Sequence, residues 1–311
     1  MLALTVRSGL VESIHRGSAV AVDSAGKVLF EYGEPDRSLY YRSAIKPLQA
    51  MVAVRVGADL SPEELAVTCS SHSGLPIHIA LVRRILHRSG LTSAALQTPV
   101  DWPLGDAAKA AVQAAGHNAP RRIWHNCSGK HAGWLAACRS AGWNPAEYLQ
   151  PDHPLQKMLI DIIHEATKLD PEPTGIDGCG APTLRGSIRG LATAFARLSS
   201  DDEFSPTATA VHRFPGLVAA NDRPDGKLAA WWDGPIKAGA QGLIGAGRHG
   251  VGVAVRSESG SSEVAVIGMI AVLRHLGMLS GAALEALETV AAPPVLGRGE
   301  PVGTVEPAIS P

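Results

Sequence analysis

Strand-like segments near both ends of the chain, separated by a long helical region, limit the folds that it can adopt. In residues 17–32, apolar segments flank Asp23 to Gly26, turn residues that are typical of a β-hairpin. Residues 243–256 contain a second pair of apolar, strand-like segments. Between the two regions, apolar residues recur with the helical period, as in residues 155–166. This order predicts an α/β fold with three layers, α/β/α, around a largely antiparallel sheet.

The composition is that of a globular protein with a small-molecule ligand. The chain has 311 residues, of which 45% are hydrophobic and 18% charged, enough for one large core. Lys and Arg number 28 and Asp and Glu 29, so a formal net charge of -1 argues against nucleic acid or an anionic membrane as partner. No segment reaches the roughly 18 apolar residues that span a bilayer, and no signal peptide is recognisable. We therefore expect a cytoplasmic location.

A serine precedes a lysine by three residues, Ser43 and Lys46, at the predicted start of a helix with Pro47 in its first turn. Residues three apart share one face of a helix, so a neutral Lys46 could accept the proton of Ser43 and make that serine a nucleophile. The alternative is that Ser43 caps the helix and Lys46 is solvated, because short motifs often match by chance.

Two further segments carry side chains suited to chemistry. Ser71 lies in the hydroxyl-rich turn 69–73, directly after a short apolar segment, a common place for functional residues. Its alternative role is to cap the helix that follows. Lys237 precedes Ala238 and Gly239, small residues that allow an extended backbone to pass close to a ligand.

The cysteines indicate a metal or a reactive thiol rather than a disulfide scaffold. The chain contains four cysteines, Cys69, Cys127, Cys138 and Cys179. Four are too few for such a scaffold in a chain of this length. Cys127 lies three residues before Lys130, and a thiolate beside an ammonium suits nucleophilic work or binding of a soft metal. Cys179 lies in a glycine-rich loop with Asp177.

Four blocks of sequence are distinctive when taken together: Arg42-Ser-Ala-Ile-Lys-Pro-Leu-Gln49, Ser71-His-Ser73, His125-Asn-Cys-Ser-Gly-Lys-His131 and Asp177-Gly-Cys-Gly-Ala-Pro182. With these blocks the chain resembles the asparaginase II-type family, the third, rhizobial-type class of L-asparaginases. The resemblance runs from about Gly9 to near Leu279, and the block at 125–131 is its most specific part. It implies a fold like that of serine β-lactamases and penicillin-binding proteins, hydrolysis of L-asparagine to L-aspartate and ammonia, and a homodimer.

The resemblance also implies roles for individual residues. The catalytic pairs would be Ser43 with Lys46 and Ser71 with Lys237. Zinc would be held by Cys127, Lys130 and Cys179, an unusual set because a lysine must be neutral to bind a metal. Arg42 and Asp177 would handle the carboxylate and the amine of the substrate.

This chain departs from the family pattern in two places. It is shorter between Arg197 and Asp233, and it ends in a long Pro- and Gly-containing segment. We expect residues 1–291 to form a single catalytic domain and residues 292–311 to form a C-terminal tail, poorly ordered or wrapped over the surface.

The expected chemistry is an acyl-enzyme reaction. Ser43 would attack the amide after giving its proton to Lys46, and Ser71, held by Lys237, would relay a proton to the leaving nitrogen. Backbone N–H groups would bind the oxyanion, and water would release the product. The sequence leaves open which serine is the primary nucleophile, whether zinc is required, and whether asparagine or glutamine is preferred.

Three other functions fit parts of the pattern. A penicillin-interactive serine hydrolase shares the Ser43-x-x-Lys46 and Lys237-Ala-Gly239 motifs, but Ser71-His-Ser73 is not its Ser-x-Asn motif. A glutaminase of the same fold would act on a substrate longer by one methylene. A non-catalytic zinc-binding protein would use Cys127 and Cys179, but it would leave both serine–lysine pairs unexplained.

Overall fold

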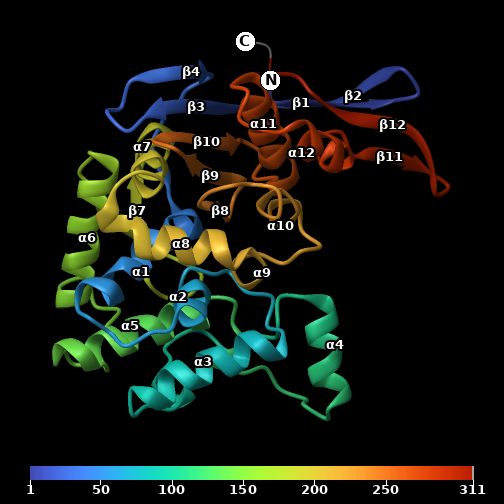
Figure 1. The fold of residues 1–311 in the computed structure, drawn as a ribbon. Coiled ribbons are helices and arrows are strands. Elements are labelled where there is room, and N and C mark those ends of the chain that lie inside the picture. Colours follow the sequence, from blue (N-terminus) through green and yellow to red (C-terminus); the bar gives the residue numbers. More distant parts are fainter. Residues whose placement is uncertain (310–311) are drawn as a thin grey trace.

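A five-stranded antiparallel sheet organises the molecule. The computed structural model describes residues 1–309, with the backbone alone for residues 172–174. The strand order is β4-β3-β10-β9-β8, and every neighbouring pair is antiparallel. The strands are β3 (Gly17–Asp23), β4 (Val28–Tyr32), β8 (Ile236–Gly239), β9 (Leu243–Arg248) and β10 (Val251–Ser257). The predicted hairpin at 17–32 and the mixed α/β class with an antiparallel sheet are confirmed (Figure 1).

The two faces of this sheet are buried by different helices, because successive residues of a strand point to opposite faces. Val20 and Val22 belong to the same core as α7 (Ile188–Leu198). Ala19 and Ala21 belong to a second core with α11 (Ser262–His275). Helix α7 lies so close that a Cβ at Gly252 would be 1.9 Å from the carbonyl oxygen of Ala192.

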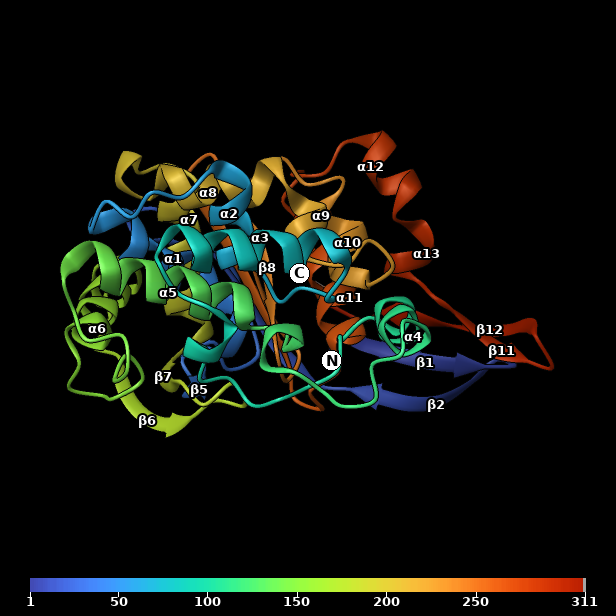
Figure 2. The same cartoon turned by 90° about the horizontal axis from the view of Figure 1, so that it is seen from below.

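A group of helices lies beside the sheet and carries most of the segments predicted to be functional (Figures 1 and 2). Helix α5 (Ser128–Ala141) is surrounded by α1 (Lys46–Arg55), α2 (Pro62–Thr68) and α3 (Pro76–Arg88). The other helices are α4 (Asp106–Ala114), α6 (Pro154–Thr167), α8 (Ser205–Arg213), α9 (Pro215–Val218), α10 (Pro224–Ala229), α12 (Gly281–Ala286) and α13 (Glu288–Ala291). Among the residues described, no helix has the length and apolarity needed to cross a membrane.

Glycines allow α5 to lie against α2. A Cβ at Gly129 would be 2.2 Å from the carbonyl oxygen of Val67, and one at Gly133 would be 2.4 Å from the methyl group of Thr68. Since Cys127 and Lys130 flank the first of these glycines, the close packing determines where both side chains lie.

A short 3₁₀ helix and a small sheet connect these parts. The 3₁₀ helix η1 (Arg42–Ile45) leads directly into α1 and packs against β8. The small sheet has the order β5-β7-β6 and consists of β5 (Leu39–Tyr40), β6 (Glu172–Ile176) and β7 (Pro182–Gly186). Its β6–β7 connection is the glycine-rich loop with Asp177 and Cys179.

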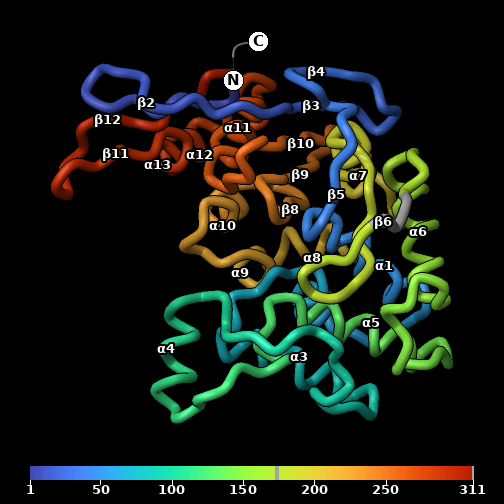
Figure 3. The backbone as a smooth tube through the Cα atoms, turned by 180° about the vertical axis from the view of Figure 1, so that it is seen from behind, coloured from blue at the N-terminus to red at the C-terminus, as the bar shows by residue number. Residues whose placement is uncertain are grey.

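A third sheet joins the two ends of the chain (Figure 3). It has the order β11-β12-β1-β2 and consists of β1 (Ala3–Arg7), β2 (Leu10–His15), β11 (Pro294–Gly297) and β12 (Glu300–Pro307). The expected C-terminal tail at 292–311 therefore contains a hairpin instead of an unstructured segment, although residues 310–311 lie outside the described residues. The hairpin turns at Arg298 and Gly299, whose φ angles are +54° and +88°, and β1 offers it an edge to pair with.

Candidate active site

Two lysine side chains meet at the hydroxyl of Ser71. Lys46 Nζ donates a hydrogen bond to Ser71 Oγ at 3.0 Å, and Lys237 Nζ donates one to the same oxygen at 3.3 Å. The three residues come from the start of α1, the segment after α2, and β8. Their exposed fractions are only 1%, 6% and 2% for Lys46, Ser71 and Lys237. The fold thus brings together residues that are far apart in the sequence.

Lys46 bonds to Ser71 and not to Ser43. Its Nζ also donates to the carbonyl oxygen of Ser70 at 2.6 Å and to Cys127 Sγ at 3.2 Å. An ammonium has three donor hydrogens, so these partners use all of them. Between the described side chains of Ser43 and Lys46 there is no hydrogen bond, which corrects the expectation of a direct pair within one helical turn.

Ser43 lies beside this cluster and is more accessible than Ser71. It belongs to η1, is half-buried, and its carbonyl oxygen accepts a hydrogen bond from the backbone N–H of Lys46. Strand β8 passes close by, because a Cβ at Gly239 would lie 2.8 Å from the backbone nitrogen of Ala44. A glycine is therefore needed at position 239 because of the backbone of η1, whereas the Lys237-Ala-Gly pattern predicted a close approach to a ligand.

Burial changes the proton affinity of Lys237. Removal from water, followed by the positive charge of Lys46, lowers the pKa of Lys237 to about 7. Its Nζ also donates to the carbonyl oxygen of Ala238 at 2.6 Å. Near neutral pH a large share of Lys237 is thus uncharged, and an uncharged amine can accept a proton from Ser71.

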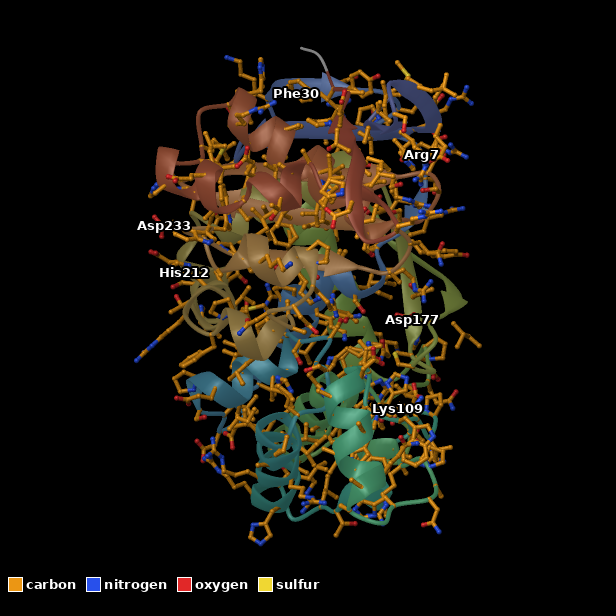
Figure 4. All side chains as sticks on the ribbon, turned by 90° about the vertical axis from the view of Figure 1, so that its right-hand side faces the viewer. Arg7, Phe30, Lys109, Asp177, His212 and Asp233 are labelled. Carbon is orange, nitrogen blue, oxygen red and sulfur yellow. The ribbon has the colours of Figure 1, made fainter. Side chains whose placement is uncertain are left out.

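Arg42 and Asp177 form an ion pair at one side of the cluster. Arg42 Nε donates to Asp177 Oδ1 at 2.7 Å, and the N–H of Gly178 donates to the same oxygen at 2.7 Å. Figure 4 shows Asp177 on the loop between β6 and β7. Burial favours a higher pKa for Asp177, but the charges of Lys130 and Arg42 outweigh it and hold the pKa below its usual range. Arg42 has a φ of +48°, an uncommon backbone conformation for a residue other than glycine.

Two sulfurs and a third lysine lie next to the serine–lysine cluster. Lys130 Nζ donates to Cys179 Sγ at 3.2 Å, and all of Cys127, Lys130 and Cys179 are buried. Hydrogen bonding with Cys179 lowers the pKa of Cys127 well below its usual range, and the charges of Lys46 and Lys130 act in the same direction against burial. Cys127 thus favours the thiolate form, which soft metal ions prefer.

The contacts and proton affinities of these three residues bear on whether they could hold a metal. Cys127 Sγ lies 3.2 Å from Lys46 Nζ and Cys179 Sγ lies 3.2 Å from Lys130 Nζ, so a lysine already contacts each sulfur. Burial favours a lower pKa for Lys130, but Cys179 and Cys127 raise it, so a metal would have to displace a proton. Groups of three or more His, Cys, Asp and Glu side chains suited to a metal do not occur in the part of the chain that the structure describes.

Comparison with known proteins identifies the family. The family model for L-asparaginase II matches residues 3–307, nearly the whole chain. The chain belongs to the L-asparaginase II family. It is accordingly an amidohydrolase of the asparaginase type, and the resemblance noted from its motifs is confirmed.

Similarity to other proteins is more distant. A solved structure described as Mglu in its native form is 15% identical, with 91% of this chain and 70% of that chain covered and a TM-score of 0.47. A structure described as Mglu in its tris and glutamate form is 13% identical, with 89% and 63% covered and a TM-score of 0.41. No curated protein matches the chain.

In this L-asparaginase II family member, several groups that hold the site together were not predicted. His72 Nε2 lies 2.9 Å from Ser128 Oγ, and the Ser128 hydroxyl donates to the carbonyl oxygen of Ile123 at 2.8 Å. Ser128 therefore accepts from His72, which fastens the segment after α2 to α5. Burial lowers the pKa of His72 well below its usual value, so the ring is neutral. His72 lies in the Ser71-His-Ser73 block and could have been singled out from the sequence. The carbonyl group of Ser70 could not, because every residue has a backbone carbonyl.

Proposed function

We propose that this protein hydrolyses L-asparagine to L-aspartate and ammonia through an acyl-enzyme. The observation that carries the proposal is the Ser71 hydroxyl between Lys46 and Lys237, with Ser43 on the adjoining turn. Hydrolysis of a primary amide needs a nucleophile and a proton for the departing ammonia. A serine–lysine network provides both within one buried cluster.

In the proposed mechanism Ser43 is the nucleophile, because it is the more accessible serine. Lys46, once neutral and turned from its partners at Ser70, Ser71 and Cys127 toward Ser43, accepts the Ser43 proton. Ser71, held by Lys237, relays a proton to the leaving nitrogen. Backbone N–H groups of η1 or β8 bind the oxyanion. Ser71 is the second candidate nucleophile, and the two lysine contacts to its Oγ favour it.

The Arg42–Asp177 pair supports an α-amino acid as substrate. A guanidinium binds a carboxylate and a carboxylate binds an ammonium, and these two side chains lie 2.7 Å apart beside η1. Asparagine and glutamine differ by one methylene, which binding distinguishes by only about 1–3 kcal/mol. We propose asparagine as the preferred substrate and glutamine as the poorer one.

We further propose that Cys127, Lys130 and Cys179 bind zinc. When bound, zinc supplies a positive charge that organises the site next to the substrate, while the proton transfers remain with the serines and lysines. Zinc content of the purified protein, measured by elemental analysis, is expected to fall in Cys179→Ser and to stay unchanged in Cys138→Ser, whose thiol lies in the core of α5. Equal zinc in both variants would contradict this ligand set.

Assembly, location and fold subclass are also proposals. The coverage of the central sheet by α7 on one face and α11 on the other supports the three-layer arrangement of serine β-lactamases and penicillin-binding proteins. The four cysteines are free, which supports a reducing, cytoplasmic location. The homodimer rests on the family resemblance and is tested by light scattering of the purified protein.

The decisive experiment is an assay of ammonia release from asparagine and glutamine, with and without a chelator. We expect Ser43→Ala to abolish turnover and the acyl-enzyme detected by mass spectrometry after rapid quenching. Ser71→Ala is expected to reduce turnover by at least about a hundredfold, the low end of the effect of proton transfer groups. Near-normal activity in Ser43→Ala would reject it as nucleophile and select Ser71.

The same preparation separates the other candidate functions. Acylation by a fluorescent penicillin without ammonia release would indicate a penicillin-interactive hydrolase. Bound zinc without hydrolysis of either amide would indicate a non-catalytic zinc-binding protein.

A further inference from the structure

A cavity separate from the serine–lysine cluster lies where three parts of the fold meet. Its volume is about 490 Å³, within the range that small-molecule sites occupy. It is lined by Ser18 at the start of β3, Tyr40 of β5, Ile188 of α7 and Arg256 of β10, among others. Figure 3 shows β3, β5, α7 and β10 gathered on one side of the molecule. Neither catalytic serine, nor any of the three lysines of the active site, lines it.

The cavity is lined by charged side chains of both signs. Its lining includes the guanidinium groups of Arg37, Arg185 and Arg256 and the carboxylates of Glu34 and Glu258. Arg37 pairs with both carboxylates, but at the long distances of 3.9 Å and 3.6 Å. Pairs that are exposed and this far apart contribute little, so neither carboxylate holds the Arg37 guanidinium strongly.

Arg256 lines the same cavity as Arg37 and is more deeply buried. Its Nε donates to the carbonyl oxygen of Ser257 at 3.2 Å, and within the described part of the chain it forms no ion pair with a carboxylate. Burial, and then repulsion by Arg37, lower the pKa of Arg256, and the smaller opposing effect of the Glu258 carboxylate does not cancel them. A half-buried guanidinium facing a like charge is unfavourable, and an anion between the two would relieve the repulsion.

The remaining walls suit the organic part of such an anion. Leu39 and Ile188 supply apolar surface, and Tyr40 supplies an aromatic ring. The Ser18 hydroxyl is buried and accepts a hydrogen bond from the backbone N–H of Glu34 at 2.9 Å, which leaves its own hydrogen free to donate. We propose that this cavity binds a small organic anion, its carboxylate or phosphate between Arg37 and Arg256 and its apolar portion toward β5 and α7.

This site is independent of the proposed asparagine hydrolysis, so binding is measured directly. Isothermal titration of the full-length protein with phenyl phosphate, benzoate and inorganic phosphate distinguishes phosphate from carboxylate recognition and measures the contribution of the ring. We expect at least one of the two ring-bearing probes to bind at millimolar concentration or below, and more tightly than inorganic phosphate. Absence of binding by all three probes would overturn the proposal.

Paired variants identify the residues responsible. Arg256→Gln is expected to raise the Kd of the probe that binds by about tenfold, because a charge-assisted hydrogen bond is lost. Glu258→Gln is expected to strengthen binding, since it removes a competing negative charge from the same cavity. Arg83→Gln, which removes an exposed arginine of α3, is the control and should bind as the wild type does. If Glu258→Gln and a folded Arg256→Gln both match the control, the site is rejected.

Discussion

Lys46 shows how far a motif can predict a site at the scale of single residues. The spacing of Ser43 and Lys46 identified two functional candidates on adjoining turns. It did not predict that the Lys46 ammonium would be used by Ser70, Ser71 and Cys127. Those partners arrive through the packing of α2 and α5 against α1, and this packing is a tertiary property with no local signal. The motif thus named the residues, and the fold determined the pairing.

Lys237 leads to a prediction about pH. Its pKa is lowered to about 7, so the amine is protonated below pH 7 and neutral above it. If Ser71 acts through neutral Lys237, kcat/KM should rise about tenfold per pH unit below pH 7 and level off above it. In Lys237→Arg the arginine cannot lose its proton, so the variant should lose activity and should no longer show the rise of kcat/KM below pH 7. Lys227→Arg, an exposed lysine of α10, is the control and should keep the wild-type profile.

The lowered pKa of Lys237 also affects stability, because the same lysine has its ordinary, higher pKa in the unfolded chain. An unfolded lysine keeps its proton up to a pKa of about 10.4, so between pH 7 and that value the unfolded state binds more protons. The free energy of unfolding should therefore rise with pH across this window. Urea titrations of the wild type and of Lys237→Met test it, because the variant should lose that part of the rise. An identical pH dependence in the two proteins would contradict the depressed pKa.

At the scale of elements, the sequence predicted regular helices and the central sheet better than its edges. The helix of residues 155–166 and the hairpin at 17–32 have strong local periodicity or turn chemistry, and both form. Strands β11 and β12 were not predicted, because prolines and glycines weaken their local signal. They exist through pairing with β1, at the opposite end of the chain.

The contact between α5 and α2 is open to a direct test. Gly129→Ala would place a Cβ against the carbonyl oxygen of Val67, so we expect a loss of about 1–3 kcal/mol of stability from overpacking. Activity should fall as well, since Cys127 and Lys130 flank this glycine. Gly281→Ala serves as the control because nothing lies within 4 Å of its added Cβ. Urea unfolding of both variants decides, and a Gly129→Ala protein as stable as the control would refute the packing argument.

At the scale of the whole molecule, the sheet that joins the chain ends belongs to the folded body. Val305 of β12 is buried in the same core as α11, so we expect Val305→Asp to destabilise the protein by roughly 3 kcal/mol or more through burial of an unpaired charge. Leu296→Asp introduces the same charge at an exposed position of β11 and should have little effect. Thermal unfolding of the two variants tests whether the hairpin is part of the folded body. If the hairpin were only attached to the surface, both substitutions would lower the Tm only slightly.

The hydrogen bonds of Lys46 also determine which residues would have to be grafted to reproduce the serine–lysine site in another protein. A designer who grafted only a serine and two lysines onto another scaffold would leave the third donor of Lys46 without its sulfur acceptor. A free donor could rotate the ammonium away from the hydroxyl. The smallest portable unit is therefore not a triad but a four-part assembly, the starts of α1 and α5, the segment after α2 and strand β8. The serine, the two lysines and the sulfur of Cys127 would therefore have to be redesigned together.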